Sequence, residues 1–184
     1  MSLQSGYDGT RCSSAEPDGN PMVLTRLVDA PTLVLGFGNV LLGDDGAGVR
    51  LVELLQSGLG TDAAEFVDGG TLSFSLLNYV EATDSMLVID AADLNDIPGT
   101  IRLFEGVAMD EFLQSTRRRT VHEVGLIDLL DMARLQGCLP NRRALLCIQP
   151  QHIDWGESLS VAVQEALPEA DRQARDTLRR WRTL

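Results

Sequence analysis

The chain has 184 residues, 44% of them hydrophobic, and a formal net charge of −12, which fits one acidic globular domain. Nucleic acids and anionic membranes bind basic surfaces, so the charge argues against both as partners. All 15 basic residues are arginines, which excludes a P-loop lysine, a Schiff-base lysine and a Ser–Lys dyad.

Other features of the sequence favour a cytoplasmic protein. No apolar run reaches the roughly 18 residues of a membrane-spanning helix, and no signal pattern opens the chain. The cysteines Cys12, Cys138 and Cys147 are widely spaced and form no CxxC pair, so neither a disulfide framework nor a thiolate zinc site is indicated. Residues 1–28 lack periodicity and predict a disordered tail before a single domain over residues 29–184.

Beyond the tail, apolar strand-like runs alternate with segments of helical spacing. The expected strands are 31–38, 63–70, 85–93, 99–106 and 143–150, and the expected helices are 46–58, 72–82, 107–116, a helix ending at Gly137, and C-terminal helices broken near Pro168. The alternation predicts a three-layer α/β fold: a twisted, mainly parallel sheet of about five strands, with 99–106 as an antiparallel edge strand and helices on both faces.

In such sheets, ligands bind beyond the carboxyl ends of the strands, where the strand order reverses. This rule selects the loop after Gly36 and the segments 68–71, 90–93 and 149–156. We expect the strands 31–38 and 85–93 to be neighbours that flank this crevice. Four residues of these segments are assigned to substrate contacts: Gly69, Gly70, Thr71 and Gln149.

The turn after the first strand, GFGNVLLGDDGAG, begins like a dinucleotide-binding loop. Leu41 replaces the third glycine of that fingerprint, and Asp44 and Asp45 would repel a pyrophosphate. A cation is therefore favoured, and a nucleotide binder is the weaker alternative. We expect Asp44 to cap the following helix and Asp45 to be free for a ligand. The residues assigned to the structural turn are Gly36, Gly38, Asn39, Asp44, Gly46 and Gly48.

Asp45 can be joined by two other residues. Asp90 ends an apolar strand, where a carboxylate is costly unless it is paired or binds a metal. His122 opens a predicted helix, and His152 is a competing histidine in a later loop. Two carboxylates and one imidazole form an incomplete site for a divalent cation such as Ni²⁺, Zn²⁺ or Mn²⁺.

Other residues carry weaker signals. There is no GxSxG motif, and Cys147 lies in an apolar strand, where a thiol is inert. The run Arg117–Arg119 is either a solvated loop or a contact for an acidic partner. The C-terminal arginines recur at helical intervals and predict a covering helix with a basic outer face.

The motifs GFGNVLLGDDGAGVRLVELL, VDGGT, LVIDAAD, PGTIRLF, VHEVGLIDLL and CIQPQ, in this order, resemble the hydrogenase maturation proteases over about residues 32–168. This resemblance implies a nickel-dependent endopeptidase that removes a C-terminal extension from a [NiFe]-hydrogenase large-subunit precursor after nickel insertion. It also implies that Asp45, Asp90 and His122 bind the metal. The metal would be nickel carried by the precursor, for which other divalent cations could substitute in vitro. Many members have Glu at the first position, whereas Asp45 is shorter by one methylene.

The expected function is therefore proteolysis of this precursor by a monomer, with Asp45 and Asp90 as the catalytic residues. Either a carboxylate acts as general base or a metal-bound water attacks, and the sequence does not choose between them. The alternative is a nickel-sensing chaperone that binds the same precursor without cutting it.

Overall fold

The computed structural model describes residues 32–60, 63–70, 76–116 and 121–182, with the backbone alone for residues 116 and 121–124. The predicted tail and the run Arg117–Arg119 lie outside these ranges. The elements, in chain order, are β1 (Thr32–Phe37), the 3₁₀ helix η1 (Gly43–Gly46), α1 (Ala47–Leu59), β2 (Glu65–Gly70), α2 (Leu77–Glu81), β3 (Ser85–Ala91), β4 (Ile101–Glu105), α3 (Val107–Thr116), α4 (Val121–Leu135), β5 (Arg142–Ile148) and α5 (Val161–Arg182).

The five strands form one sheet in the order β2-β1-β3-β5-β4. β1 pairs in parallel with β2 and β3, β3 pairs in parallel with β5, and β4 runs antiparallel to β5 at the edge. This confirms the predicted fold class and the predicted neighbourhood of the first and third strands.

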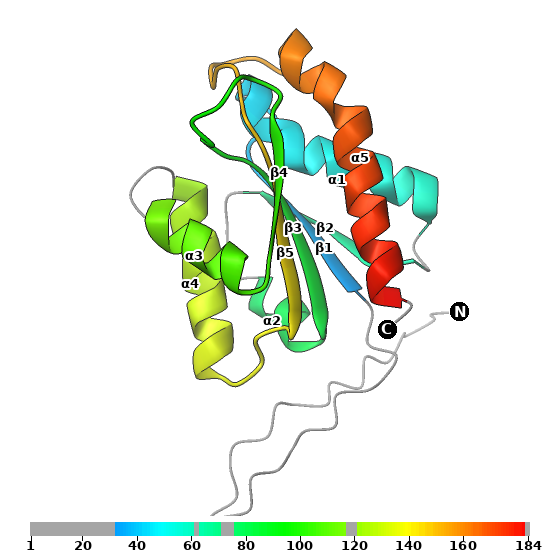
Figure 1. Cartoon of the computed structure of the whole chain (residues 1–184), viewed down its shortest axis with the longest axis vertical. Helices are drawn as coiled ribbons and strands as arrows, with labels where there is room; N and C mark the ends of the chain where they lie inside the picture. The colour runs from blue at the N-terminus through cyan, green and yellow to red at the C-terminus, as the bar shows by residue number, and fades with distance from the viewer. Residues whose placement is uncertain (1–31, 61–62, 71–75, 117–120, 183–184) are drawn as a thin grey trace, which may run out of the picture.

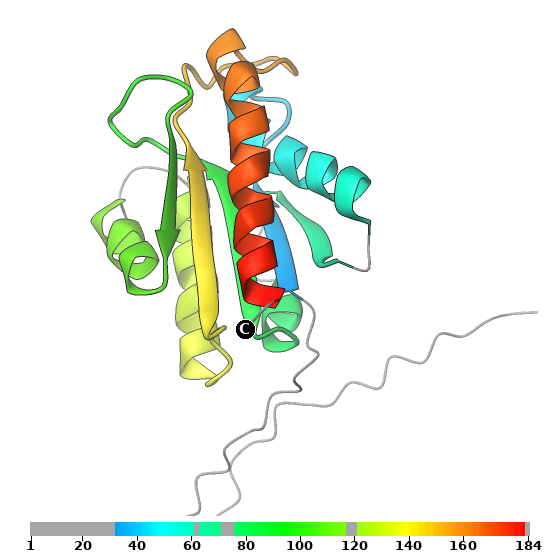
Figure 2. The same cartoon turned by 45° about the vertical axis from the view of Figure 1, so that its right-hand side comes forward.

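Helices cover both faces of the sheet, as Figures 1 and 2 show. Side chains alternate between the two faces along each strand. Leu33, Leu35 and Phe37 of β1 belong to the core under α2, α3 and α4, whereas Val34 belongs to the core under α1 and α5. All seven residues of β3 are buried, as expected for a central parallel strand covered on both sides.

The edge strand β4 also contributes to both cores. Ile101 and Leu103 face the core under α1 and α5. Phe104 faces the other core and stacks on Phe112 of α3, with 4.2 Å between the ring centroids. The predicted alternation is therefore present, but on the second face only Arg102 is exposed, because Phe104 is covered by α3.

The prediction of a break near Pro168 is wrong, because α5 is a single helix of 22 residues that contains this proline. A proline inside a helix costs about 3 kcal/mol in lost hydrogen bonding and ring clashes. The apolar stripe continues through the proline and is buried against the sheet: Val163, Ala170, Ala174, Leu178 and Trp181. Burial of this stripe on both sides of Pro168 offsets the local cost.

Within the described ranges, none of the helices has the length and apolar character that crossing a lipid bilayer requires. Cys138 and Cys147 are both buried free thiols. Cys147 is fully buried in β5, which confirms its assignment to the core.

Candidate active site

The order of the strands reverses at β1, because the chain continues from β1 to β2 on one side and later places β3 on the other. The carboxyl ends of β1 and β3 are therefore the switch point at which ligands bind in open α/β sheets. Asp90 is the sixth of the seven residues of β3, and η1, which carries Asp44 and Asp45, packs against β3.

Glycine allows the turn after β1 to lie tightly against the sheet. A Cβ atom on Gly48 would lie 2.4 Å from the carbonyl oxygen of Ile89 and 2.5 Å from that of Phe37. Gly38 has a φ of +124°, and its Cβ would lie 1.8 Å from the carbonyl oxygen of Asp45. All three distances are too short for a residue with a Cβ atom, so the close approach of helix to strand is provided by Gly48 and needs no glycine at position 41.

Asp45 is held by the turn itself. Its Oδ2 atom accepts a hydrogen bond from the backbone N–H of Asn39 at 2.7 Å. The side chain of Asn39 in turn accepts the N–H of Leu41 at 3.0 Å. Asp45 is 5% exposed, so this turn fixes a nearly buried carboxylate beside the end of β3.

The prediction that Asp44 caps the following helix is wrong. Gly46 occupies the N-cap position of α1, and no side chain caps it. Asp44 is fully buried and accepts backbone N–H groups from Gln151 at 2.8 Å, His152 at 3.4 Å and Ser160 at 2.6 Å. Its carboxylate therefore ties the loop after β5 to the turn after β1.

These contacts also set the ionisation of Asp44. Burial on its own would raise the pKa of the carboxyl group. The hydrogen bonds from Ser160, Gln151 and His152 outweigh burial and lower the pKa below the usual value. Asp44 therefore stays ionised at neutral pH, with its charge neutralised by backbone dipoles.

The side chain of Asp90 lies on the face of the sheet covered by α2, α3 and α4. Its neighbour in the strand, Val88, and its register partner in β5, Cys147, both belong to the core on that face. Ile89 and Ala91 alternate to the opposite core. Asp90 is 3% exposed, so it is a nearly buried carboxylate directed toward the layer that contains α4.

His122 is the second residue of α4. Figures 1 and 2 show α4 packed alongside the sheet, with its first residues toward the carboxyl ends of the parallel strands. The fold thus brings the start of α4 to the edge and the face on which Asp90 lies. The side chain of His122 is outside the described part of the structure. Among the described residues alone, no three His, Cys, Asp or Glu side chains form a group that could hold a metal.

Two carboxylates suit the oxygen-rich part of a divalent-cation site, and an imidazole would complete a mixed ligand set. Asp45 and Asp90 come from adjacent segments of the switch point, and each is nearly buried. His152, the competing ligand, is exposed, and its backbone binds Asp44. It therefore lies at the rim, as its position in the sequence predicted.

Three of the four residues assigned to substrate contacts, Gly69, Gly70 and Gln149, lie at this edge. The carbonyl of Gly70 accepts the N–H of Gly38 at 3.1 Å, and Gly69 packs against Gly36 and Phe37. Gln149 directs its Oε1 atom to the N–H of Leu94 at 2.7 Å. This hydrogen bond anchors the loop after β3, so any contact of Gln149 with substrate stays a prediction. Thr71 lies outside the described residues.

Sequence reasoning missed the tethering role of Asp44. Its donors are 107 to 116 positions further along the chain, and local patterns do not reveal such pairs. The only sequence signal was the presence of two adjacent acids where a helix needs at most one cap. Ser160 also caps α5, with its hydroxyl oxygen accepting the N–H of Val163 at 3.3 Å.

Comparison with known proteins identifies the family of the chain. Residues 49–176 match the family model described as hydrogenase maturation protease. The chain is 36% identical over 151 residues to the hydrogenase expression/formation protein HoxM of Cupriavidus necator, covering 81% of this chain and 74% of that protein. It is 32% identical over 149 residues to the hydrogenase 2 maturation protease of Escherichia coli, covering 80% and 90%.

Solved structures give the same result. The hydrogenase maturating endopeptidase HybD of E. coli superposes with a TM-score of 0.76 at 30% identity, over 82% of this chain and 93% of that one. The [NiFe] hydrogenase maturation protease HybD of Thermococcus kodakarensis gives a TM-score of 0.68 at 27% identity, over 79% and 97%. The chain belongs to the hydrogenase maturation protease family.

Proposed function

We propose that this protein is the endopeptidase that removes the C-terminal extension from the large-subunit precursor of a [NiFe] hydrogenase after nickel has been inserted. Membership of the protease family supports the reaction class. The observation that carries the site is the placement of Asp45 and Asp90, two nearly buried carboxylates, at the switch point between β1 and β3.

In this proposal the nickel is part of the substrate. The precursor presents Ni²⁺ on its own cysteine thiolates, and Asp45, Asp90 and His122 complete the coordination. Carboxylate and imidazole ligands are compatible with this ion, although they do not select it over other divalent cations. Recognition of bound nickel would then place the scissile peptide bond at the carboxyl edge of the sheet.

Peptide hydrolysis requires a water molecule to lose a proton as it attacks the carbonyl carbon, and the leaving amine to gain one. A carboxylate of Asp45 or Asp90 can accept the first proton and return it to the amine as the C–N bond breaks. The backbone N–H of Asn39 fixes the orientation of Asp45 before substrate arrives. Preorganisation of this kind lowers the barrier because no group has to reorient during the reaction.

The role of each ligand can be tested on nickel-loaded precursor, because removal of the extension changes its mobility on a gel. Asp45→Asn, Asp90→Asn and His122→Ala should each slow processing by at least about a hundredfold, as expected for loss of a group in the reacting site. Glu111→Gln is the control, because this exposed acid lies on α3, outside the candidate site, and should leave the rate unchanged. A variant that processes at the wild-type rate removes that residue from the site.

Two further results would each reject one part of the proposal. Full-rate processing of nickel-free precursor would eliminate nickel recognition. Binding of nickel-loaded precursor with no change in its mobility would indicate the alternative, a nickel-sensing chaperone. We place the reaction in the cytoplasm, in keeping with the buried free thiols of Cys138 and Cys147.

A further inference from the structure

An exposed apolar strip lies beside the candidate site. Trp155 is 84% exposed, and Leu41 and Ile153 are also exposed. Trp155 and Ile153 belong to the loop after β5, and Leu41 belongs to the turn after β1. Single exposed apolar side chains are common, but a group of three that includes a tryptophan at the edge of a site is a candidate binding surface.

Backbone contacts bring two members of this strip, Leu41 and Trp155, together. Gly156 donates its N–H to the carbonyl of Leu41 at 2.9 Å and accepts the N–H of Gly43 at 2.6 Å. Leu42 and Gly156 thus form a parallel bridge. Leu41 and Trp155 each precede the bridged pair by one residue, so the bridge places their backbones side by side. Figures 1 and 2 show the loop before α5 beside the turn before α1 in both views.

The strip is fixed relative to the candidate site by Asp44. The carboxylate that binds the N–H groups of Gln151, His152 and Ser160 is adjacent in sequence to Asp45. The loop that carries Trp155 is therefore anchored at both ends to the turn that carries Asp45. A side chain exposed on a loop usually moves independently of the site, but here both belong to one hydrogen-bonded unit.

We propose that Leu41, Ile153 and Trp155, called the apolar strip below, dock an apolar segment of the hydrogenase precursor next to the bond to be cleaved. The inference rests on the proposed function, because the precursor must approach this edge to reach Asp45 and Asp90. Asp154 and Glu157 are exposed on the same loop, so the docked segment carries no excess of acidic residues. The residues of the strip act as positioning residues, since they hold substrate without touching the reacting atoms.

The test is the steady-state rate of processing of nickel-loaded precursor by Trp155→Ser. Loss of one buried tryptophan contact should raise KM about tenfold to a hundredfold, with kcat within about twofold of wild type. Trp155→Phe keeps an aromatic surface and should restore KM to near the wild-type value. Because Trp155 is so exposed in the free protein, neither substitution should alter folding.

Leu135→Ser is the matched control. Leu135 is 88% exposed and ends α4 just before β5, at the opposite edge of the sheet. This variant should leave both KM and kcat unchanged. If Trp155→Ser also leaves KM unchanged while the wild type processes the precursor, the apolar strip is not a docking surface and the proposed function stands. If the wild type does not process the precursor at all, the proposed function itself fails.

Two other outcomes would overturn the docking role. A fall in kcat with KM unchanged would assign Trp155 to the chemical step. A concentration-dependent rise in the mass of the wild-type protein, lost in Trp155→Ser without a change in KM, would assign the strip to contact between two copies of this chain.

Discussion

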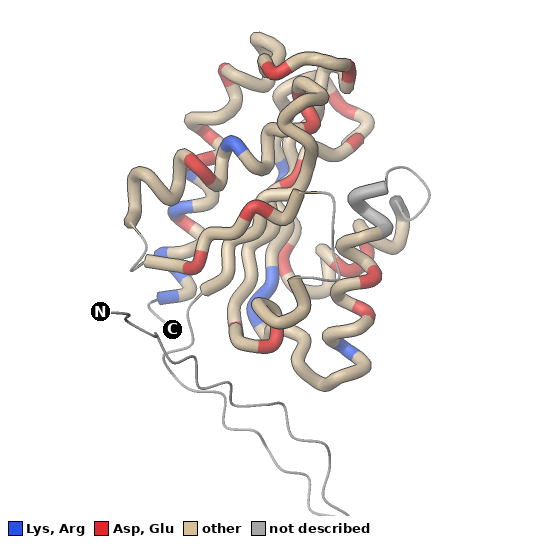
Figure 3. Tube along the Cα trace, turned by 180° about the vertical axis from the view of Figure 1, so that it is seen from behind, with Lys and Arg blue, Asp and Glu red and all other residues tan. Residues whose placement is uncertain are grey.

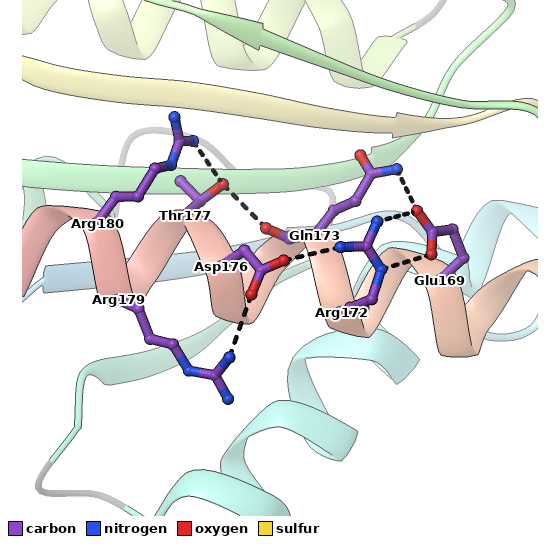
Figure 4. A network of polar contacts seen from close by, with 7 residues as sticks. All are labelled: Glu169, Arg172, Gln173, Asp176, Thr177, Arg179 and Arg180. Carbon is purple, nitrogen blue, oxygen red and sulfur yellow. Dashed lines mark hydrogen bonds and ion pairs between the residues drawn. The ribbon is translucent and has the colours of Figure 1, made fainter.

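Two regions of this protein hold carboxylates whose pKa is lowered, and they do so by different means. At the carboxyl edge of the sheet, Asp44 is fully buried and accepts three backbone N–H groups. On the outer face of α5, Glu169 is exposed and binds the side chains of Arg172 and Gln173, as Figure 4 shows.

Hydrogen bonds from Arg172 and Gln173 lower the pKa of Glu169 to about 2. Arg172 also binds Asp176, which binds Arg179 in turn. The prediction of a basic outer face on α5 is therefore wrong, because Arg172, Arg175 and Arg179 pair with acids of the same helix and Arg180 pairs with Glu105 of β4. Figure 3 shows Asp and Glu interspersed with Arg along the trace, in a chain whose acids outnumber its bases.

The comparison shows that a lowered pKa alone does not identify a functional carboxylate. Exposed ion pairs are screened by water and contribute little to stability. A buried carboxylate that fixes two distant segments controls the local structure, because its removal leaves backbone donors without partners. In the first region, backbone N–H groups hold the carboxylate of Asp44. In the second region, exposed side chains hold the carboxylate of Glu169.

The largest loss of stability is expected on substitution of Gly48. In Gly48→Ala, the new methyl group would meet the carbonyl oxygens of Ile89 and Phe37 at 2.4 and 2.5 Å. The backbone must shift to relieve this, at a cost of about 3 kcal/mol or more in the free energy of unfolding. A thermal melt measures the loss. Gly60→Ala is the control, because its Cβ would meet nothing within 4 Å. The φ of Gly60 is +75°, so this variant should still lose some stability through backbone strain, but less than Gly48→Ala. Equal melting temperatures for the two variants would contradict the close contact.

A smaller effect is expected at Asp44. Asp44→Asn removes the charge that the three N–H groups bind and should lower the free energy of unfolding by about 2–4 kcal/mol in urea titrations at pH 7.

The difference between wild type and Asp44→Asn should depend on pH. Because the pKa of Asp44 is lower in the folded state, its stabilising contribution is complete above the unfolded value near 4 and declines as pH falls through the folded value. The two proteins should therefore converge in stability below about pH 4. A difference that is constant from pH 7 to pH 3 would show that the charge is not the source.

Arg180 ranks third. It joins α5 to β4 through Glu105, at 2.9 Å between Nη2 and Oε1, with both side chains about half exposed. Arg180→Gln should cost at most about 1 kcal/mol, and the cost should vanish in 1 M salt, where exposed ion pairs are screened. A salt-independent loss would instead point to the packing of the arginine stem.

The smallest effect is expected at Glu169. Its low pKa means that its contribution is present above about pH 4.5 and is lost as pH falls toward 2. Since the group is exposed, Glu169→Gln should not shift the melting temperature measurably at pH 7. A clear shift in the melting temperature would show that the exposed carboxylate of Glu169 also contributes to stability, as the buried carboxylate of Asp44 does.

Much of this fold follows from periodicity. The apolar runs of β1, β3 and β5 predict buried strands, and the polar glycine turns place their carboxyl ends at one edge. The positions of Asp90 and Asp45 at this edge could be predicted because Asp90 ends an apolar run and Asp45 lies in the turn that follows β1. The error at Pro168 arose because tertiary packing along α5 outweighs a local helix breaker.

The site could be predicted only in part. Neither the N–H groups that bind Asp44 nor the bridge between Leu42 and Gly156 leaves a pattern in the sequence, because both join segments more than 100 residues apart. The adjacent acids Asp44 and Asp45 look equivalent in the sequence. The structure separates them, since one faces the loop after β5 and the other is held by Asn39.

The long separation between Asp44 and its donors has a consequence for synthesis on the ribosome. The turn that bears Asp44 emerges long before Ser160, so its carboxylate stays hydrated until the last strand and the start of α5 have arrived. The edge that carries the apolar strip can therefore close only when nearly the whole chain exists. A chain still attached to the ribosome should not bind precursor, whereas the released chain should, and a pull-down that compares the two would test this.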